Sequence, residues 1–339
     1  MAICHKQTKC CIIGSRNEIY FVDRLGSPTT SLTIRLRLEY RVSTDIARIR
    51  SFPTHPYLQI MSKSALVSTD WLSSHVAEKN IRVLDASWHL PATGRKAYQE
   101  YLQAHIPGAV YFDIDAHSLP SGLPHMLPAA DDFAKAAAQM GINDDAIIVV
   151  YDTVGVFSAA RVWWMFRHYG VNSVYLLDGG LPAWQHKNLP VESGPVTVEP
   201  GIFTAGPVRR SVVDSNDVHA ASISNSHMIL DARPLSRFSG KEPEARPGLR
   251  SGHIPNSVSL PFTKLLTDNG FLKAKADLIE IFTQLGWTSS KPVISSCGSG
   301  VTAAIILLAL HEIGYDEGAL YDGSWAEWGA LQDLPVATG

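Results

Sequence analysis

The stretch best suited to chemistry is a lone cysteine in a glycine-rich loop. The apolar run 292–294 leads toward Cys297, two glycines follow within three residues, and residues 303–310 indicate a buried helix. A strand, a tight loop and a helix N-terminus in this order surround the sulfur with backbone N–H groups and the positive end of the helix dipole. This setting favours the nucleophilic thiolate. A buried structural cysteine is the alternative, but the flanking glycines favour a reactive thiol.

Length, charge and cysteine use narrow the class of protein. The 339 residues suggest about two domains, and 45% hydrophobic with 18% charged residues is typical of a soluble globular chain. A net charge of -3 gives no reason to expect a nucleic acid or a membrane as a partner. Three of the 4 cysteines lie in the first eleven residues, so no disulfide framework is expected and a reducing compartment is favoured. No cysteine and histidine spacing predicts a metal site.

The first sixty residues differ in composition from the rest. They hold nine Lys and Arg against four Asp and Glu, and only residues 32–38 alternate in polarity. An Arg-rich, acid-poor leader is typical of a transit peptide, which would direct the protein to mitochondria. We favour the other interpretation, an upstream extension with the functional start at Met61 and a cytoplasmic protein. In both cases residues 1–61 are expected to be poorly ordered.

From Met61 onward the chain repeats itself. Four short stretches recur in the same order, at offsets of 146, 148, 145 and 144 residues. The pairs are 81–86 with 228–232, 105–110 with 253–258, 147–152 with 292–297, and 177–180 with 321–324. Four ordered matches at a nearly constant offset indicate a duplicated domain.

Each half alternates β-branched runs with helical stretches. The expected helices span residues 132–140, 159–169, 276–285 and 301–313. This alternation predicts an α/β fold of tandem duplicated domains, each a mostly parallel sheet flanked by helices. We assign residues 62–188 to the first domain and 211–339 to the second, with the Pro- and Gly-rich residues 189–210 as the linker.

The duplication is asymmetric at the reactive loop. The first half has Asp152 where the second has Cys297, and the bulkier residues 153–157 follow it. The first domain therefore lacks a thiol nucleophile, and we expect it to form one wall of the site.

These features resemble the rhodanese family of sulfurtransferases. The resemblance covers about residues 66–336 and rests on the two His-Ile-Pro turns, the Asp-Gly-Gly and Asp-Gly-Ser-Trp turns, and the cysteine loop in the second half. The neutral loop is similar to that of the members that use 3-mercaptopyruvate, whereas thiosulfate-using members carry basic residues there, which suit a compact dianion. The resemblance implies tandem rhodanese-like domains. It also implies sulfur transfer from 3-mercaptopyruvate through a Cys297 persulfide to cyanide or to a thiol such as thioredoxin, without metal or organic cofactor.

The resemblance also implies roles for individual residues. Arg237 and Arg246 fall where the family places the arginines that bind the substrate carboxylate and ketone, for which a guanidinium offers a planar fork. The alternative is a pair of surface arginines bonded to Glu242 and Glu244. The loop residues expected to hold the sulfur charge through their backbone are Gly298, Gly300, Val301 and Thr302.

A serine that faces a histidine of the first domain, with an acid behind it, is a further implication of the resemblance. Ser299 and His105 occupy these places, and we expect both to be catalytic. The acid is not identified by the sequence, although Glu100 and Asp113 lie near His105. His105 can equally be a structural residue of its His-Ile-Pro turn, like its counterpart His253.

Three other functions stay open. A thiosulfate-preferring rhodanese is disfavoured by the neutral loop. A cysteine phosphatase on the same fold needs a longer loop ending in an arginine, whereas this one ends in Val301-Thr302-Ala303. A non-catalytic rhodanese-like binding module fits the first half but not the second, because only the second contains Cys297.

Overall fold

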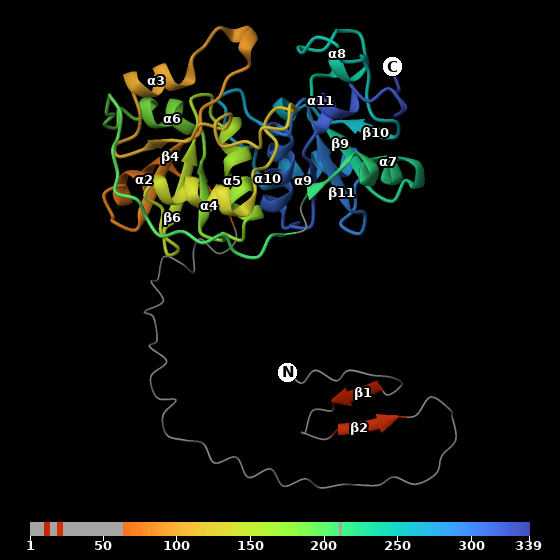
Figure 1. Ribbon diagram of the computed structural model, residues 1–339, viewed down its shortest axis with the longest axis horizontal. Coiled ribbons are helices and arrows are strands. Elements are labelled where there is room, and N and C mark those ends of the chain that lie inside the picture. Colours follow the sequence, from red (N-terminus) through yellow and green to blue (C-terminus); the bar gives the residue numbers. More distant parts are fainter. Residues whose placement is uncertain (1–9, 14–18, 23–63, 210–211) are drawn as a thin grey trace. The chain divides into compact units, whose positions relative to one another are not determined.

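The computed structural model describes residues 10–13, 19–22, 64–209 and 212–339 (Figure 1). In the first of its two compact units, Met1–Thr54, strand β1 (Cys10–Ile13) pairs antiparallel with β2 (Ile19–Val22). We expected residues 1–61 to be poorly ordered. Apart from the two strands, these residues lie outside the described part of the chain.

The second unit, His55–Gly339, contains two five-stranded sheets of the same topology. The first has the order β3-β7-β6-β4-β5, and the second has the equivalent order β8-β12-β11-β9-β10, with parallel pairing in both. The first sheet comprises β3 (Leu66–Val67), β4 (Ile81–Asp85), β5 (Val110–Tyr111), β6 (Ile147–Tyr151) and β7 (Val174–Leu177). The second comprises β8 (Val212–Val213), β9 (Met228–Asp231), β10 (Ser257–Ser259), β11 (Val293–Ser296) and β12 (Ala319–Tyr321). The predicted duplication and α/β fold are confirmed.

Helices flank both sheets, which is why the central strands are continuously apolar. The first domain contains α2 (Thr69–His75), α3 (Ala97–Gln103), α4 (Ala130–Gln139), α5 (Ser158–His168), α6 (Gly180–His186) and the 3-10 turn η2 (Pro91–Thr93). The second contains α7 (Ser215–Ser224), α8 (Leu235–Phe238), α9 (Lys275–Gln284), α10 (Ala303–Ile313), α11 (Ser324–Trp328) and η3 (Phe262–Leu265). The four predicted helices correspond to α4, α5, α9 and α10. The last begins two residues later than predicted, because Val301 and Thr302 belong to the loop.

The two domains meet along α5 and α10, which follow β6 and β11 and pack side by side (Figure 1). One hydrophobic cluster runs through both domains and includes Trp163 and Phe166 of α5 with Ile305 and Leu308 of α10. This contact brings α5 beside the loop that precedes α10. Among the described residues, no helix is long and apolar enough to cross a membrane.

Each domain extends a loop onto the other, and the two loops are equivalent by the repeat. The backbone N–H of Leu127 donates to Asp322 Oδ2 at 2.7 Å, and that of Leu272 donates to Asp178 Oδ1 at 2.9 Å. The aspartates belong to the repeated Asp-Gly turns. Each Asp-Gly turn therefore also holds a loop of the other domain.

Candidate active site

Cys297 lies directly after β11, at the carboxyl edge of the second sheet. Its thiol is free and the residue is 2% exposed. The Asp-Gly-Ser-Trp turn fixes its backbone, because Cys297 N–H donates to Ser324 Oγ at 3.2 Å and Trp325 N–H donates to Cys297 O at 2.9 Å. The sulfur is thus carried on a rigid strand end.

The loop after the cysteine requires a glycine at position 300. Gly300 has a φ of +78°, in the left-handed region. A Cβ there would lie 3.0 Å from Arg161 Nη1 and 3.1 Å from the carbonyl of Asp322. The loop is therefore packed tightly against α5 of the first domain.

The loop presents backbone N–H groups with no partner. The N–H groups of Ser299, Gly300 and Thr302 have no acceptor within the described part of the chain. The equivalent loop of the first domain shows what such groups bind. There the Asp152 carboxylate accepts bonds of 2.8–2.9 Å from four N–H groups, those of Val154, Gly155, Phe157 and Ala159. This loop geometry is an anion receptor, filled in the first domain and open beside Cys297.

Ser299 contacts a histidine of the first domain, but that histidine is His125 and not the predicted His105. Ser299 Oγ lies 2.9 Å from His125 Nδ1, and His125 Nε2 lies 3.0 Å from Asp115 Oδ1. The acid is thus Asp115, and neither Glu100 nor Asp113 takes this place. Because His125 donates to it, the pKa of Asp115 is lowered from its usual value.

Two features hold this serine–histidine–aspartate array. Trp88 Nε1 donates to Asp115 Oδ2 at 3.0 Å, and the Trp88 ring lies edge-on to His125 with centroids 4.7 Å apart. His125 itself adopts a left-handed backbone, with a φ of 60°, at the position where the second domain has Gly270 with a φ of 76°. A non-glycine residue in this conformation is strained, and such strain concentrates at functional sites.

His105 is a structural residue of its His-Ile-Pro turn. It is fully buried, its Nδ1 lies 2.9 Å from the Tyr101 carbonyl, and its ring stacks on Tyr101. His253 repeats this arrangement on Phe238, with a Nδ1–carbonyl distance of 2.8 Å and a stacked ring. The expectation that His105 faces Ser299 is wrong, because the two turns perform the same packing role in both domains.

Arg246 lies at the cysteine loop, and Arg237 is near enough to Arg246 to affect it electrostatically. A Cβ built on Gly298 would be 3.8 Å from Arg246 Nη1. Burial lowers the pKa of Arg246, an effect that the carboxylates of Glu244 and Asp115 oppose and that the nearby Arg237 reinforces. Neither guanidinium forms a hydrogen bond or an ion pair with any described residue.

The two acids that could have neutralised these arginines are engaged elsewhere. Glu242 accepts a hydrogen bond from Ser236 at 2.8 Å, and Glu244 pairs with the buried Arg233 at 2.6 Å. Arg233 also binds both oxygens of Asp231 at the end of β9. The segment that carries Arg246 is therefore tied to the sheet by Arg233, and Arg246 is left unpaired.

Comparison with known proteins shows the family of this chain. A model of the rhodanese-like domain matches residues 68–187 and 215–331. The chain belongs to the rhodanese-like family. It is 46% identical over 280 residues to a 3-mercaptopyruvate sulfurtransferase of Escherichia coli, covering 81% of this chain and 99% of the relative.

Two further comparisons bear on substrate and fold. The chain is 38% identical over 299 residues to thiosulfate/3-mercaptopyruvate sulfurtransferase 1, mitochondrial, of Arabidopsis thaliana, covering 82% of this chain and 79% of the relative. The crystal structure of SseA, a 3-mercaptopyruvate sulfotransferase of Escherichia coli, superimposes with a TM-score of 0.72 at 44% identity. That alignment covers 78% of this chain and 100% of the other.

The sequence contained one usable signal for the residues that were missed. The offset of 145 residues aligns His125 with Gly270, so a histidine stands where its counterpart is a turn glycine. The offset of 148 residues that applies to the His-Ile-Pro turns shows that His105 recurs in the second half as His253. A residue needed only for chemistry in one site is expected to differ between the halves, which favours His125 over His105.

Proposed function

We propose that this chain is an enzyme that moves the sulfur of 3-mercaptopyruvate through a persulfide on Cys297 to an acceptor thiol, with release of pyruvate. The observation that carries the proposal is the convergence of an open ring of backbone N–H groups, the Cys297 thiol and two unpaired arginines. The names of the relatives in Escherichia coli and Arabidopsis support the same donor substrate.

In the first step the Cys297 thiolate attacks the substrate sulfur. A sulfur–sulfur bond forms, the carbon–sulfur bond breaks, and its electron pair remains on carbon as the enolate of pyruvate. Uptake of one proton then gives pyruvate, and Cys297 holds an additional SH group. The unpaired N–H groups of Ser299, Gly300 and Thr302 would stabilise the sulfur charge before and after transfer, as an oxyanion hole does for oxygen.

The arginines would bind the organic end of the substrate. Its carboxylate and ketone lie two and one carbon atoms beyond the sulfur-bearing carbon, so cations set back from the sulfur match it. Arg246, close to Gly298, and Arg237 beside it offer planar forks that no acid of the described chain occupies. Their role is to orient the acid so that its sulfur faces Cys297.

The Ser299–His125–Asp115 array would manage the proton. The Ser299 hydroxyl is hydrogen-bonded to His125, whose other ring nitrogen faces the Asp115 carboxylate. This arrangement lets His125 accept or return a proton through Ser299 while Asp115 stabilises the charged ring. A hydroxyl two residues from the cysteine can thus donate to the enolate as it forms.

A second substrate, thiosulfate, has one observation in its favour. The name of the Arabidopsis relative includes thiosulfate beside 3-mercaptopyruvate. The neutral Gly298 and Ser299 favour mercaptopyruvate. The second step, transfer from the persulfide to a small thiol or thioredoxin, and a cytoplasmic location complete the proposal.

The test is an intact-mass measurement after incubation with 3-mercaptopyruvate. The protein should gain the mass of one sulfur atom, and a peptide map should place it on Cys297. The ratio of kcat/KM for mercaptopyruvate and thiosulfate, measured with the same acceptor, should favour mercaptopyruvate. A protein that gains no sulfur from either donor would contradict the proposed function.

A further inference from the structure

Arg161 is a charged residue of the domain without the cysteine, yet its guanidinium reaches the cysteine loop. It lies on α5 and is 0% exposed. Its guanidinium carbon sits 4.7 Å from the centre of the Trp164 ring. A fully buried cation of this kind is costly unless each donor finds a fixed acceptor.

Its Nη1 and Nη2 donors meet three separate segments of the site, whereas its buried Nε has no partner among the described residues. Nη2 donates to the His125 carbonyl at 2.5 Å and to Asp322 Oδ1 at 2.7 Å, and Nη1 donates to the Gly300 carbonyl at 3.4 Å. The first segment carries the histidine, the third carries Ser299 and the loop amides, and Asp322 begins the turn that holds the Cys297 backbone. One side chain therefore connects the His125 loop, the cysteine loop and the turn at Asp322.

The contacts constrain orientation as well as distance. His125 has a strained left-handed backbone, and a donor on its own carbonyl stabilises that peptide orientation. In a trans peptide the carbonyl of Gly300 and the N–H of Val301 point in opposite directions, so holding the carbonyl also orients that N–H. The planar five-donor fork of an arginine can serve these diverging acceptors together, whereas the single ammonium of a lysine cannot.

The repeat shows that the fold itself does not need this arginine. The equivalent position on α10 is Ile306, which is buried in the shared cluster. Asp178, the counterpart of Asp322, accepts a hydrogen bond from Leu272 and has no arginine partner among the described residues, and burial raises its pKa. The same turn and the same inter-domain contact are thus built in the first domain without a guanidinium. Arg161 of the first domain thus serves the cysteine loop of the second, and its counterpart Ile306 repeats no such polar contact in the other direction.

We propose that Arg161 is a positioning residue for sulfur transfer: from the first domain it sets His125 against Ser299 and holds the Gly300 carbonyl of the cysteine loop. The inference rests on the proposed sulfur transfer and adds a requirement to it. Arg161 contacts neither the substrate nor Cys297 and acts through His125 and the loop.

The experiment compares three variants with the wild-type full chain. Arg161→Lys keeps the buried charge but not the fork. Arg161→Met combined with Asp322→Asn removes both charges together and leaves no orphaned carboxylate. Arg167→Met is the matched control, since Arg167 lies on the same helix and faces Asp316 at 3.5 Å, outside the site. For each, kcat and KM for 3-mercaptopyruvate and the Tm are measured.

Positioning predicts that Arg161→Lys and the double variant lose at least about tenfold in kcat, with KM changed less than about threefold, while Arg167→Met keeps wild-type kcat. The loss should persist in the double variant even where its Tm returns to the wild-type value. In a His125→Asn background, Arg161→Lys should cost less than about threefold more, because both changes disable the same unit.

Several results would overturn the inference. Wild-type kcat in Arg161→Lys, or recovery of kcat together with Tm in the double variant, would assign Arg161 to stability alone, as would failure of both variants to fold. A full tenfold loss added to that of His125→Asn would show that it does not act through His125. An inactive wild-type protein would instead reject the proposed function.

Discussion

The loops after β6 and β11 have the same place in their domains and opposite states. In the second domain the loop amides are open beside Cys297, and Arg246 is unpaired. In the first domain the Asp152 carboxylate fills the amides from within. The comparison shows that an anion-binding loop is a property of the duplicated fold. The residue at the first position of the loop decides its state. Asp152 occupies the amides with its own carboxylate, whereas Cys297 leaves them free to bind a ligand.

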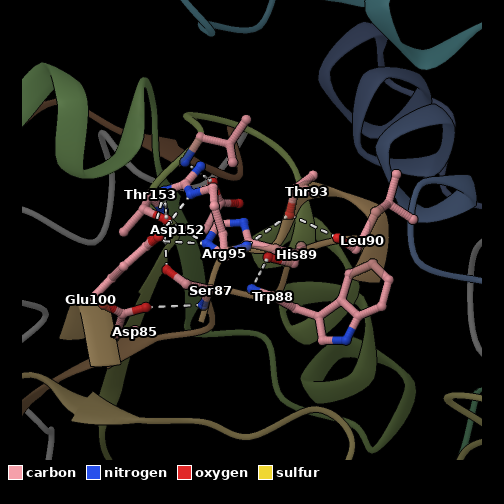
Figure 2. A network of polar contacts seen from close by, with 12 residues as sticks. Asp85, Ser87, Trp88, His89, Leu90, Thr93, Arg95, Glu100, Asp152 and Thr153 are labelled. Carbon is pink, nitrogen blue, oxygen red and sulfur yellow. Dashed lines mark hydrogen bonds and ion pairs between the residues drawn. The ribbon is translucent and has the colours of Figure 1, made fainter. Parts of the chain in front are cut away.

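Figure 2 shows that Arg95, the arginine at the loop of the first domain, is paired with the carboxylate of Glu100. Arg95 Nη2 donates to Thr153, the counterpart of Gly298, at 3.3 Å, and Arg95 is paired with Glu100 at 2.6 Å. Glu100 also binds His89 at 2.9 Å. Arg95 thus lies at the same place in its loop as Arg246 does in the other half, but its guanidinium is paired with the Glu100 carboxylate.

The closed loop of the first domain supports the open one of the second. Thr153 N–H donates to Ser87 Oγ at 3.0 Å, and Trp88 N–H donates to Ser158 Oγ at 3.0 Å. These bonds fix Trp88, which contacts both Asp115 and His125. The domain that lacks the cysteine therefore supplies the His125 and Asp115 that face Ser299 of the other domain.

The largest expected effect comes from removing the thiol of Cys297 from the open loop of the second domain. Cys297→Ser should abolish the mass gain and turnover, because the serine hydroxyl is not ionised at neutral pH and cannot carry the sulfur. Thermal unfolding should be close to that of wild type. Replacement of Cys4, Cys10 and Cys11 together is the control and should leave turnover unchanged. Turnover by Cys297→Ser within tenfold of wild type would remove this residue from the mechanism.

The next effect comes from the unpaired arginines. Arg246→Ala or Arg237→Ala should lower kcat/KM for 3-mercaptopyruvate about ten- to a hundredfold, as expected for the loss of about 1.5–3 kcal/mol from a charge-assisted bond to a carboxylate. Steady-state kinetics with mercaptopyruvate and thiosulfate measure the selectivity. Arg95→Ala, in the closed half, is the matched control and should change neither. Equal losses for both donors would argue against carboxylate binding.

A smaller effect is expected where the closed half supports the open one. Trp88→Phe keeps the ring against His125 but removes the N–H that binds Asp115. We expect kcat to fall by roughly three- to tenfold, the range of one hydrogen bond of about 1 kcal/mol, with little change in KM. The pH profile of kcat should shift at its acid side, since Asp115 loses a donor that lowers its pKa. Unchanged kcat and profile would show that Asp115 is held without Trp88.

The smallest effect on activity is expected at the aspartates that end β4 and β9. The same change should have a measurable effect on the free energy of unfolding. Asp231 is neutralised by Arg233, whereas its counterpart Asp85 has Ser87 beside it, and burial raises the pKa of Asp85 to about 6 from 3.8. Between these values the unfolded chain has released a proton that the folded chain keeps. The free energy of unfolding therefore falls as the pH rises from about 4 to about 6, and the loss is complete above that.

Asp85→Asn should remove this loss and raise the free energy of unfolding above pH 6 by up to about 3 kcal/mol, since each pKa unit corresponds to about 1.4 kcal/mol. Turnover should stay at the wild-type value. Denaturant unfolding at pH 4.5 and pH 7.5 measures the effect, and the difference between the two proteins should be smaller at the lower pH. A variant that is no more stable at pH 7.5 would show that water or local rearrangement already solvates Asp85.

The sequence by itself determined the architecture and half of the site. Repeated β-branched runs and turns encode topology locally, so the duplication, the parallel sheets and the position of Cys297 followed from pattern and offset. The sequence also indicated a tight loop through its two glycines. The structure gives the reason at Gly300, where the left-handed backbone and the packing against Arg161 leave no space for a Cβ. The arginines followed from the family resemblance, and their unpaired state did not.

Only the tertiary structure decided which side chains of the first domain enter the site. His125 sits on a loop with no periodicity, 174 residues from Ser299 in sequence, and reaches it because α5 packs on α10. The buried contacts of Arg161 and the filling of one amide ring by Asp152 likewise depend on how elements dock. Docking is set by the summed packing of a shared core, which no local pattern of residues contains.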